Sequence, residues 1–309
     1  MLPMNLRLIL IPLLASCIIA GSTSARAQDK GSVDPKPLPP LANPNDPKIA
    51  AKELFGRKLL PAAMPTRVIG FYAKGCLAGA EALPINGDTW QVMRLSRNRN
   101  WAHPDMVALL ERLSAKAHKD AGWLGILVGD MSQPRGGPML SEHRSHQIGL
   151  DVDIWFTPMP DHVQSRKERE FTPGTDMVAP DMLDVDPQVW THTHAALIRA
   201  AAQDPVVVRV LVNAAIKKAL CREAGADRTW LYKVRPWYGH AEHFHVQTMC
   251  PDDSPDCKPP TPTLADDGCG RDLDFWFKES TLHPPPSKPK PPLTLSDLPA
   301  ACRQIVKAK

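Results

Sequence analysis

The spacing of hydrophobic residues along the chain changes between a helical and a strand pattern. Over 105–118 apolar side chains recur three or four positions apart, which predicts a helix, and Gly122 follows as a stop signal. Over 150–156 apolar residues instead occupy every second position, which predicts a strand with two different faces. The helical positions are Met106, Leu109, Leu110 and Leu113; the strand alternates Leu150, Val152, Ile154 and Phe156 with Asp151, Asp153 and Trp155.

The other regular segments add to the same mixture of elements. Helices are predicted over 190–202 and 213–223, the second with Asn213 as its N-cap and Gly225 just beyond its end. Apolar, β-branched or alternating residues predict strands over 123–128, 206–212 and 244–246. The prediction is therefore an α+β fold, with a small antiparallel sheet flanked by helices and long proline-rich loops.

The N-terminal 27 residues predict a secretory signal peptide. Arg7 supplies a positive charge, residues 8–20 form an apolar core, and Ala-Arg-Ala at 25–27 matches a small-x-small cleavage site. The apolar core is short for a membrane span, so no span is expected in the mature protein. Two alternatives stay open: an uncleaved anchor, and lipidation at Cys17, which ends a lipobox-like stretch over 14–17.

Proline shapes the organisation of the remaining chain. There are 33 prolines against 18 glycines, and two segments, 31–47 and 284–292, are rich in them. Such segments favour extended structure without a packed core. The predicted division is a signal peptide (1–27), a proline-rich arm (28–54), a main domain (55–280) and a proline-rich tail (281–309).

Cysteine usage and charge narrow the class of protein. Cleavage after Ala27 leaves six of the seven cysteines, and an even number in an exported chain predicts three disulfides among 15 possible pairings. No CxxC spacing is present, which argues against a zinc ribbon or a thioredoxin-like site. The formal charge of +4 falls to +2 on cleavage because two arginines leave, so no nucleic-acid partner is expected.

Two short clusters carry the candidate chemistry. Residues 145–153 read Ser-His-Gln-Ile-Gly-Leu-Asp-Val-Asp, and residues 239–245 read Gly-His-Ala-Glu-His-Phe-His. Side chains two positions apart on a strand share a face, so His243 and His245 are expected to point the same way, as are Asp151 and Asp153. Two neighbouring strands can therefore bring His146, Asp153 and His245 around one ion.

Two imidazoles and one carboxylate suit a catalytic Zn²⁺ ion that keeps one position open for water. Such an ion makes bound water acidic near neutral pH and polarises a carbonyl group. His243, beside His245, can take the proton of the water or stabilise an oxyanion. The competing interpretation is that these histidines are merely packed or exposed on strands. A serine nucleophile at Ser141 or Ser145 has no supporting motif.

The two clusters together resemble the penicillin-insensitive murein endopeptidase family. That family lies in a superfamily with lysostaphin-type and D-Ala-D-Ala metallopeptidases and the hedgehog N-terminal domain. The resemblance rests on 145–155 and on Gly-His-x-x-His-x-His-Val at 239–246. The stretches 128–132, 210–221 and 235–239 extend it over roughly residues 55–280.

The resemblance implies a periplasmic zinc endopeptidase that cuts D-alanyl–meso-diaminopimelyl cross-bridges of peptidoglycan. It implies zinc ligation by His146, Asp153 and His245, with His143 as a further histidine associated with metal. It also implies that His243 is catalytic and that His240 is an accessory active-site residue. The implied disulfides are Cys76–Cys302, Cys221–Cys269 and Cys250–Cys257.

The resemblance also raises a second zinc site at the interface of a homodimer. Its ligands cannot be placed from the sequence, although Asp181, Asp184, Asp186, His192 and His194 lie in the relevant region.

Two alternative functions stay open. One is a D-Ala-D-Ala carboxypeptidase, in which Arg135 or Arg144 would capture a terminal carboxylate. The other is a non-catalytic, zinc-containing protein that binds the cell wall.

Overall fold

The structure is a computed structural model that describes residues 31–309 apart from 142–143, 263–265, 287 and 289. The predicted signal peptide, Cys17 and His143 therefore lie outside the described residues. Among the described helices, none is both long enough and apolar enough to cross a bilayer.

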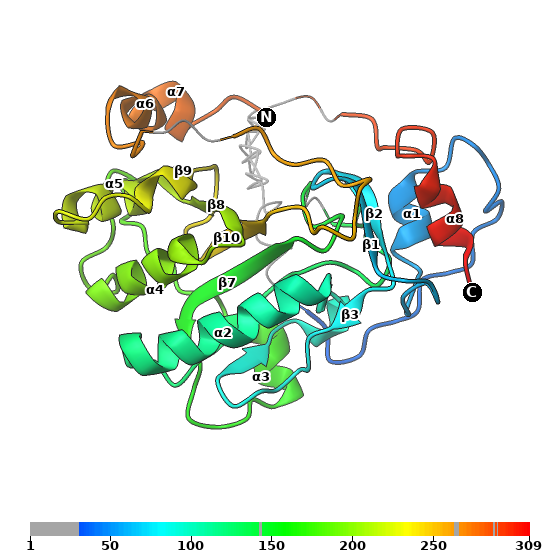
Figure 1. Ribbon diagram of the computed structural model, residues 1–309, viewed down its shortest axis with the longest axis horizontal. Coiled ribbons are helices and arrows are strands. Elements are labelled where there is room, and N and C mark those ends of the chain that lie inside the picture. The colour runs from blue at the N-terminus through cyan, green and yellow to red at the C-terminus, as the bar shows by residue number, and fades with distance from the viewer. Residues whose placement is uncertain (1–30, 142–143, 263–265, 287, 289) are drawn as a thin grey trace, which may run out of the picture.

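A six-stranded sheet forms the centre of the molecule, with the strand order β4-β6-β7-β10-β8-β9 (Figure 1). The pairs β6–β7, β7–β10 and β10–β8 are antiparallel, so the predicted α+β fold with an antiparallel sheet is confirmed at its centre. The edge pairs β4–β6 and β8–β9 are parallel, because a helix connects the two strands of each pair. The strands are β4 (Trp90–Val92), β6 (Ile126–Val128), β7 (Asp151–Pro158), β8 (Val207–Val212), β9 (Val234–Pro236) and β10 (His243–Thr248).

Three helices cover one face of this sheet: α2 (Pro104–Ala121), α4 (His192–Gln203) and α5 (Ala214–Glu223). All three lie where the sequence predicts helices. Gly122 follows α2 with φ +69°, a left-handed conformation that glycine adopts without strain. Asn213 caps α5, because its side-chain oxygen accepts a hydrogen bond from the Ala215 amide at 2.9 Å.

The alternation along β7 separates the hydrophobic core from the polar chemistry. Val152, Ile154 and Phe156 point into the core beneath the helices. Asp151 and Asp153 point to the opposite face, yet they are buried as well. The sequence predicts the two faces of this strand but not that loops cover the polar one.

A smaller hydrophobic cluster lies beside the main sheet, where α1 (Ala51–Phe55) and α8 (Ala301–Lys307) pack with the hairpin of β1 (Arg67–Phe71) and β2 (Lys74–Ala78). Figure 1 shows this group at one end of the molecule, next to the C-terminus. The remaining elements are β3 (Glu81–Ala82), β5 (Trp101–Ala102), α3 (Arg166–Phe171), α6 (Arg271–Asp274), α7 (Glu279–Leu282) and the 3₁₀ turns η2 (Leu95–Arg97), η3 (Leu231–Lys233) and η4 (Phe275–Phe277).

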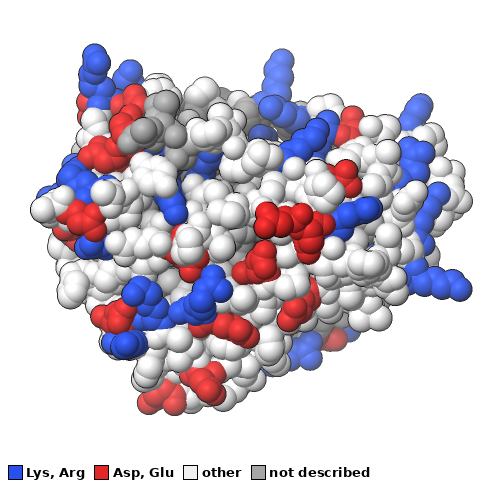
Figure 2. Space-filling model, in the orientation of Figure 1, with Lys and Arg blue, Asp and Glu red and all other residues white. Residues whose placement is uncertain are grey.

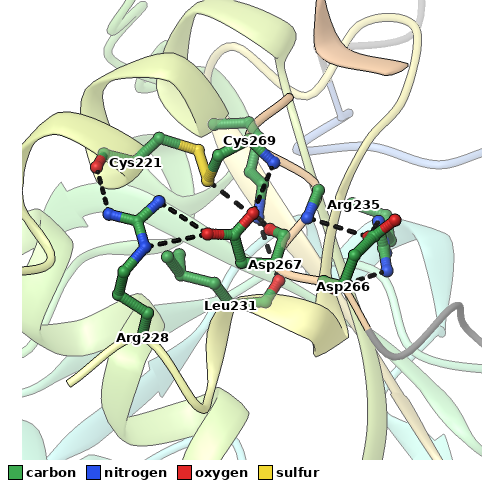
Figure 3. The surroundings of a disulfide bond; sticks show 9 residues. Cys221, Arg228, Leu231, Arg235, Asp266, Asp267 and Cys269 are labelled. Atoms are coloured by element: carbon green, nitrogen blue, oxygen red, sulfur yellow. Dashed lines mark hydrogen bonds and ion pairs between the residues drawn. A yellow bond between two sulfur atoms is a disulfide. The ribbon is translucent and has the colours of Figure 1, made fainter. Parts of the chain in front are cut away.

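All three disulfides implied by the resemblance are present. Cys76–Cys302 lies inside the smaller cluster, and Cys250–Cys257 closes a short loop after β10. Cys221–Cys269 joins α5 to the segment before α6 (Figure 3). The bonds therefore tie α8 to β2, tie the segment before α6 to α5, and close the loop after β10.

The buried side chain of Lys217 on α5 also holds the segment before α6. Its ammonium donates to the carbonyl oxygens of Leu231 at 2.9 Å and of Asp267 at 2.6 Å. Burial lowers the pKa of Lys217 to about 7, and the neighbouring charge of Arg235 adds to the shift. Lys217 thus makes the stability of the fold depend on pH.

We expect the free energy of unfolding to rise with pH from about 7 towards 10.5 because of Lys217. Its pKa is about 7 in the folded protein, whereas the ordinary value for an exposed lysine is 10.5, so in this window the unfolded chain binds one more proton. Relative to a Lys217→Met variant, the slope should approach about 1.4 kcal/mol per pH unit. Urea unfolding of both proteins across this range measures it, and equal slopes would contradict the prediction.

Candidate metal centre

The pairing of β7 with β10 assembles the candidate site. His245 lies opposite Asp153, and Gln247 lies opposite Asp151. Directly opposed residues on antiparallel strands project from the same face, so these four side chains meet on the face away from the helices. The register therefore brings the two sequence clusters together, as their spacing predicts.

His146, Asp153 and His245 come together as a compact group of buried donors. The Nδ1 atom of His245 lies 2.9 Å from Asp153 Oδ1, and the Nε2 atom of His146 lies 3.4 Å from Asp153 Oδ2. One donor atom from each residue lies within 4.8 Å of the others, and this is the one such group within the described part of the chain.

The donor set and its spacing fit a zinc ion. Ligands about 2.1 Å from a tetrahedral ion lie about 3.4 Å from one another. The measured separations are close to this value, and two imidazoles with one carboxylate are donors that zinc favours. The site can therefore hold zinc with little rearrangement.

Asp151 organises the group, a role that the sequence did not reveal. Its side chain is fully buried, and its Oδ1 atom lies 2.7 Å from His245 Nε2 and 2.9 Å from Gln247 Nε2. A hydrogen bond from His245 Nε2–H to a carboxylate leaves the Nδ1 atom to face Asp153, which is the usual way proteins orient a metal-binding imidazole.

Asp151 also fixes the loop that carries His146. Its Oδ2 atom accepts a hydrogen bond from the His146 amide at 3.2 Å, and its Oδ1 atom accepts one from the Ser145 hydroxyl at 2.8 Å. His146 has φ +64°, a left-handed conformation that is unfavourable for a residue with a side chain. The contacts to Asp151 help to hold it there.

The charges of the cluster are strongly coupled in the metal-free protein. Burial opposes ionisation of Asp153, but the charges of His146 and His243 outweigh it and hold the pKa of that carboxyl well below its usual range. Burial likewise lowers the pKa of His245, but hydrogen bonds to Asp151 and Asp153 prevail and raise it to about 10. A metal binding at His245 therefore displaces a proton.

His243 and His240 lie beside the three donors. The Nε2 atom of His243 lies 3.6 Å from Asp153 Oδ1, and its side chain is 27% exposed. The His240 ring lies 5.0 Å from the ring of His243 and 5.8 Å from that of His245. Like His146, His240 has a left-handed backbone, with φ +55°.

Both of these histidines have a pKa below the ordinary value of an imidazole. Burial lowers the pKa of His240 to about 3, and the neighbouring histidines add to the shift. Burial also lowers the pKa of His243, although the charge of Asp153 works against it. A neutral imidazole next to the donor group is able to accept a proton.

Asp130, Arg97 and Arg99 support β7 from outside the donor group, which the sequence did not predict either. Asp130 follows β6, and its backbone carbonyl accepts a hydrogen bond from the Asp153 amide at 2.9 Å. Its carboxylate pairs with Arg99 at 2.5 Å and with Arg97 at 3.1 Å. These contacts support the backbone of Asp153, but the sequence offers no local signal for them because the partners come from three separate segments.

Arg135 does not serve as a carboxylate-binding residue, and it is not a surface charge. It is 5% exposed, and its guanidinium donates to the carbonyls of Leu60, Ile305, Val306 and Ala308. It therefore satisfies the free carbonyl groups at the end of α8, a common use of arginine near a helix C-terminus.

Two of the residues considered for a second zinc site, Asp184 and His194, contact other groups of the fold. Asp184 forms ion pairs with Arg222 at 2.9 Å and Lys218 at 3.3 Å. The Nε2 atom of His194 lies 3.2 Å from the Phe156 carbonyl oxygen. His143 lies outside the described residues. The second zinc site and the homodimer stay predictions.

Comparison with known proteins shows the family of the chain. A family model described as penicillin-insensitive murein endopeptidase matches residues 68–307. A protein of that name from Haemophilus influenzae is 46% identical over 238 residues, which cover 77% of this chain and 82% of the relative. The Yersinia enterocolitica and Klebsiella pneumoniae proteins of the same name are 43% and 41% identical, over 80% and 77% of this chain and 87% and 85% of their own lengths. The chain belongs to the penicillin-insensitive murein endopeptidase family.

Proposed function

We propose that the protein is a zinc-dependent endopeptidase that cuts D-alanyl–meso-diaminopimelyl cross-bridges of peptidoglycan. The observation that carries the proposal is the buried group of His146, Asp153 and His245, with His243 beside it. The names of the relatives support murein as the substrate.

The residues have distinct roles in this proposal. His146, Asp153 and His245 hold the ion, and His143 is a further metal-associated histidine. When bound, zinc supplies a Lewis acid that makes water acidic and polarises the scissile carbonyl. His243 accepts a proton from the attacking water and returns it to the leaving amine nitrogen.

His240 has an accessory role at the same site. Its Nδ1 atom lies 2.7 Å from the Tyr238 carbonyl oxygen, which fixes the ring beside His243. Because His240 is neutral, it adds no positive charge next to the imidazole that takes up the proton.

Insensitivity to β-lactams follows from the use of water as nucleophile. β-Lactams act by acylating a serine, and this site offers no activated serine in the proposed mechanism. The Ser145 hydroxyl donates to Asp151 at 2.8 Å and serves the His146 loop. The proposed inhibitors are instead metal chelators.

We further propose that the protein works in the periplasm after cleavage of its signal peptide. The three disulfides support an oxidising compartment. The predicted boundaries of arm, domain and tail remain part of this proposal.

The carboxypeptidase alternative is weakened by the position of Arg135. A carboxypeptidase requires a cation at the site for the terminal carboxylate, and the Arg135 guanidinium is committed to α8. Arg144 is exposed in the loop before His146 and remains the other candidate.

Product analysis distinguishes the two activities. We expect purified zinc-loaded protein to convert cross-linked muropeptide dimers to monomers without releasing free D-alanine, as followed by liquid chromatography and mass spectrometry. Stoichiometric release of D-alanine from pentapeptide stems would show the carboxypeptidase instead. No cleavage of any murein fragment would favour the non-catalytic wall-binding alternative.

A further inference from the structure

Four aromatic side chains gather on the surface next to the candidate metal centre. We call this group, Trp237, Tyr238, Phe275 and Trp276, the aromatic platform. Trp276 links its parts, with ring centroids 5.0 Å from Tyr238, 5.9 Å from Phe275 and 6.3 Å from Trp237. Trp237, Tyr238 and Phe275 are 52%, 50% and 49% exposed. An exposed cluster of this kind marks a binding surface more often than scattered single residues do.

The aromatic platform is continuous with the catalytic group. Trp237 and Tyr238 belong to the loop that leads into His240, and the Tyr238 carbonyl contacts the His240 ring. The Trp237 amide donates to the Val212 carbonyl at 2.8 Å, which anchors the loop to β8. The loop of Trp237 and Tyr238 therefore joins the platform to the residues beside the metal centre.

Phe275 and Trp276, the other half of the platform, follow a segment that is fixed to α5. Cys221–Cys269 fixes the start of its segment to α5, and Arg228 reinforces the join by donating to the Asp267 carboxylate and the Cys221 carbonyl (Figure 3). Lys217 also binds the Asp267 carbonyl. Figure 1 shows α6 and α7 beside α5 and β9 as a result. The rings are thus preorganised, which reduces the entropy lost when a ligand binds.

We propose that the aromatic platform binds the glycan strand of peptidoglycan, with its rings stacked against the apolar faces of pyranose units. This inference rests on the proposed function, since the stem peptides that the enzyme would cut are attached to that strand. Pyranose rings present C–H groups to aromatic faces and hydroxyls to polar neighbours. Asp272, Asp274 and Lys278 are exposed neighbours of Phe275 along the chain, and the Lys278 ammonium lies 5.7 Å from the centre of the Phe275 ring. Their side chains can bind such hydroxyls.

The size and charge of the surface favour a saccharide over a second copy of the chain. Four partly exposed aromatic side chains present about 400 Å², about half of what each partner buries in a standard interface. Figure 2 shows both acidic and basic side chains on one face of the molecule. Next to Phe275 along the chain, the exposed charges are also of both signs, Asp272 and Asp274 with Lys278. Recognition through stacking and hydroxyl contacts suits such a surface.

Direct binding to a soluble saccharide tests the proposal independently of peptide cleavage. The probe is a β-1,4-linked tetramer of N-acetylglucosamine, titrated by calorimetry into the zinc-loaded mature chain. We expect saturable binding that becomes about tenfold weaker in Phe275→Ala and in Trp276→Ala, the scale of losing one packed aromatic side chain. Phe171→Ala is the matched control, because Phe171 is 41% exposed on α3, outside the platform.

Cleavage of two substrates gives the second arm of the test. On intact sacculi, Phe275→Ala and Trp276→Ala should cut about tenfold more slowly than wild type; on a sugar-free cross-linked peptide dimer, the rates should match. Binding energy from a distant part of the substrate explains this difference. Trp276→Phe, which keeps an aromatic face, should restore much of the activity on sacculi.

The outcomes separate the two proposals. If wild type binds the tetramer but cleaves neither substrate, the proposed function fails and the glycan site stands. Equal losses on both substrates, or tetramer binding that the substitutions leave unchanged, would overturn the glycan site. It would also be overturned if the substitutions converted a dimer to a monomer in sedimentation without altering saccharide binding.

Discussion

Replacing His243 by alanine is expected to lower the cleavage of cross-linked muropeptides about thousandfold, while the protein keeps one equivalent of zinc. His243 is partly exposed and adjacent to Asp153, and burial lowers its pKa, so its imidazole can transfer protons without being one of the three buried donors. Its removal should therefore affect the rate and leave the metal in place. Steady-state kinetics and metal analysis of the same preparation measure both quantities.

Controls for this prediction come from the chain itself. His162→Ala removes a histidine whose side chain is 53% exposed and paired with Glu168, outside the metal centre, and should leave the rate unchanged. Wild type stripped by a chelator should lose activity and regain it with added zinc, and anomalous scattering at the zinc edge should place the ion at the three donors. A His243→Ala protein with full zinc and undiminished cleavage would refute the catalytic role.

Replacing Asp151 by alanine is expected to weaken zinc binding about 100-fold, although Asp151 is not among the predicted ligands. The substitution removes the partner that sets the orientation of His245 and the contact that holds the His146 amide. Two of the three donors thus lose their support at once. Competition with a chromophoric chelator measures the affinity.

The design separates a positioning role from loss of the fold. At saturating zinc, Asp151→Ala should recover a large part of its activity, and its thermal unfolding should remain cooperative. Asp151→Asn keeps an oxygen that can accept from His245 but places an amide near the Ser145 hydroxyl and the His146 amide, so an intermediate affinity is expected. Wild-type zinc affinity in Asp151→Ala would contradict the assigned role.

The spacing of residues close together along the chain predicted β7, β10, α2 and α5. Residues alternate in type over 151–156 and 243–247, which predicts two strands with one polar face each. Because these strands are neighbours in the sheet, His245 lies opposite Asp153 on that face. Helical spacing and the Asn213 cap likewise located α2 and α5. These signals are carried by residues that are adjacent along the chain.

Contacts between distant segments were not predictable in the same way. The parallel edges of the sheet depend on where α2 and α5 return the chain, and the burial of the polar face of β7 depends on the loops above it. The support of Asp153 by Asp130 requires β6 to lie beside β7. Asp151 was visible as a neighbour of Asp153, but its role became clear only from the geometry.

The disulfide between β2 and α8 has a consequence for biosynthesis. Cys76 and Cys302 are 226 residues apart, so in a chain that crosses a membrane from its N-terminus, one thiol arrives long before its partner. In such an exported chain, Cys76 would stay an unpaired thiol, open to oxidants and to wrong pairings, until translocation is nearly complete. A chain broken off before residue 302 would lack the native partner of Cys76, a chemical difference between incomplete and finished copies.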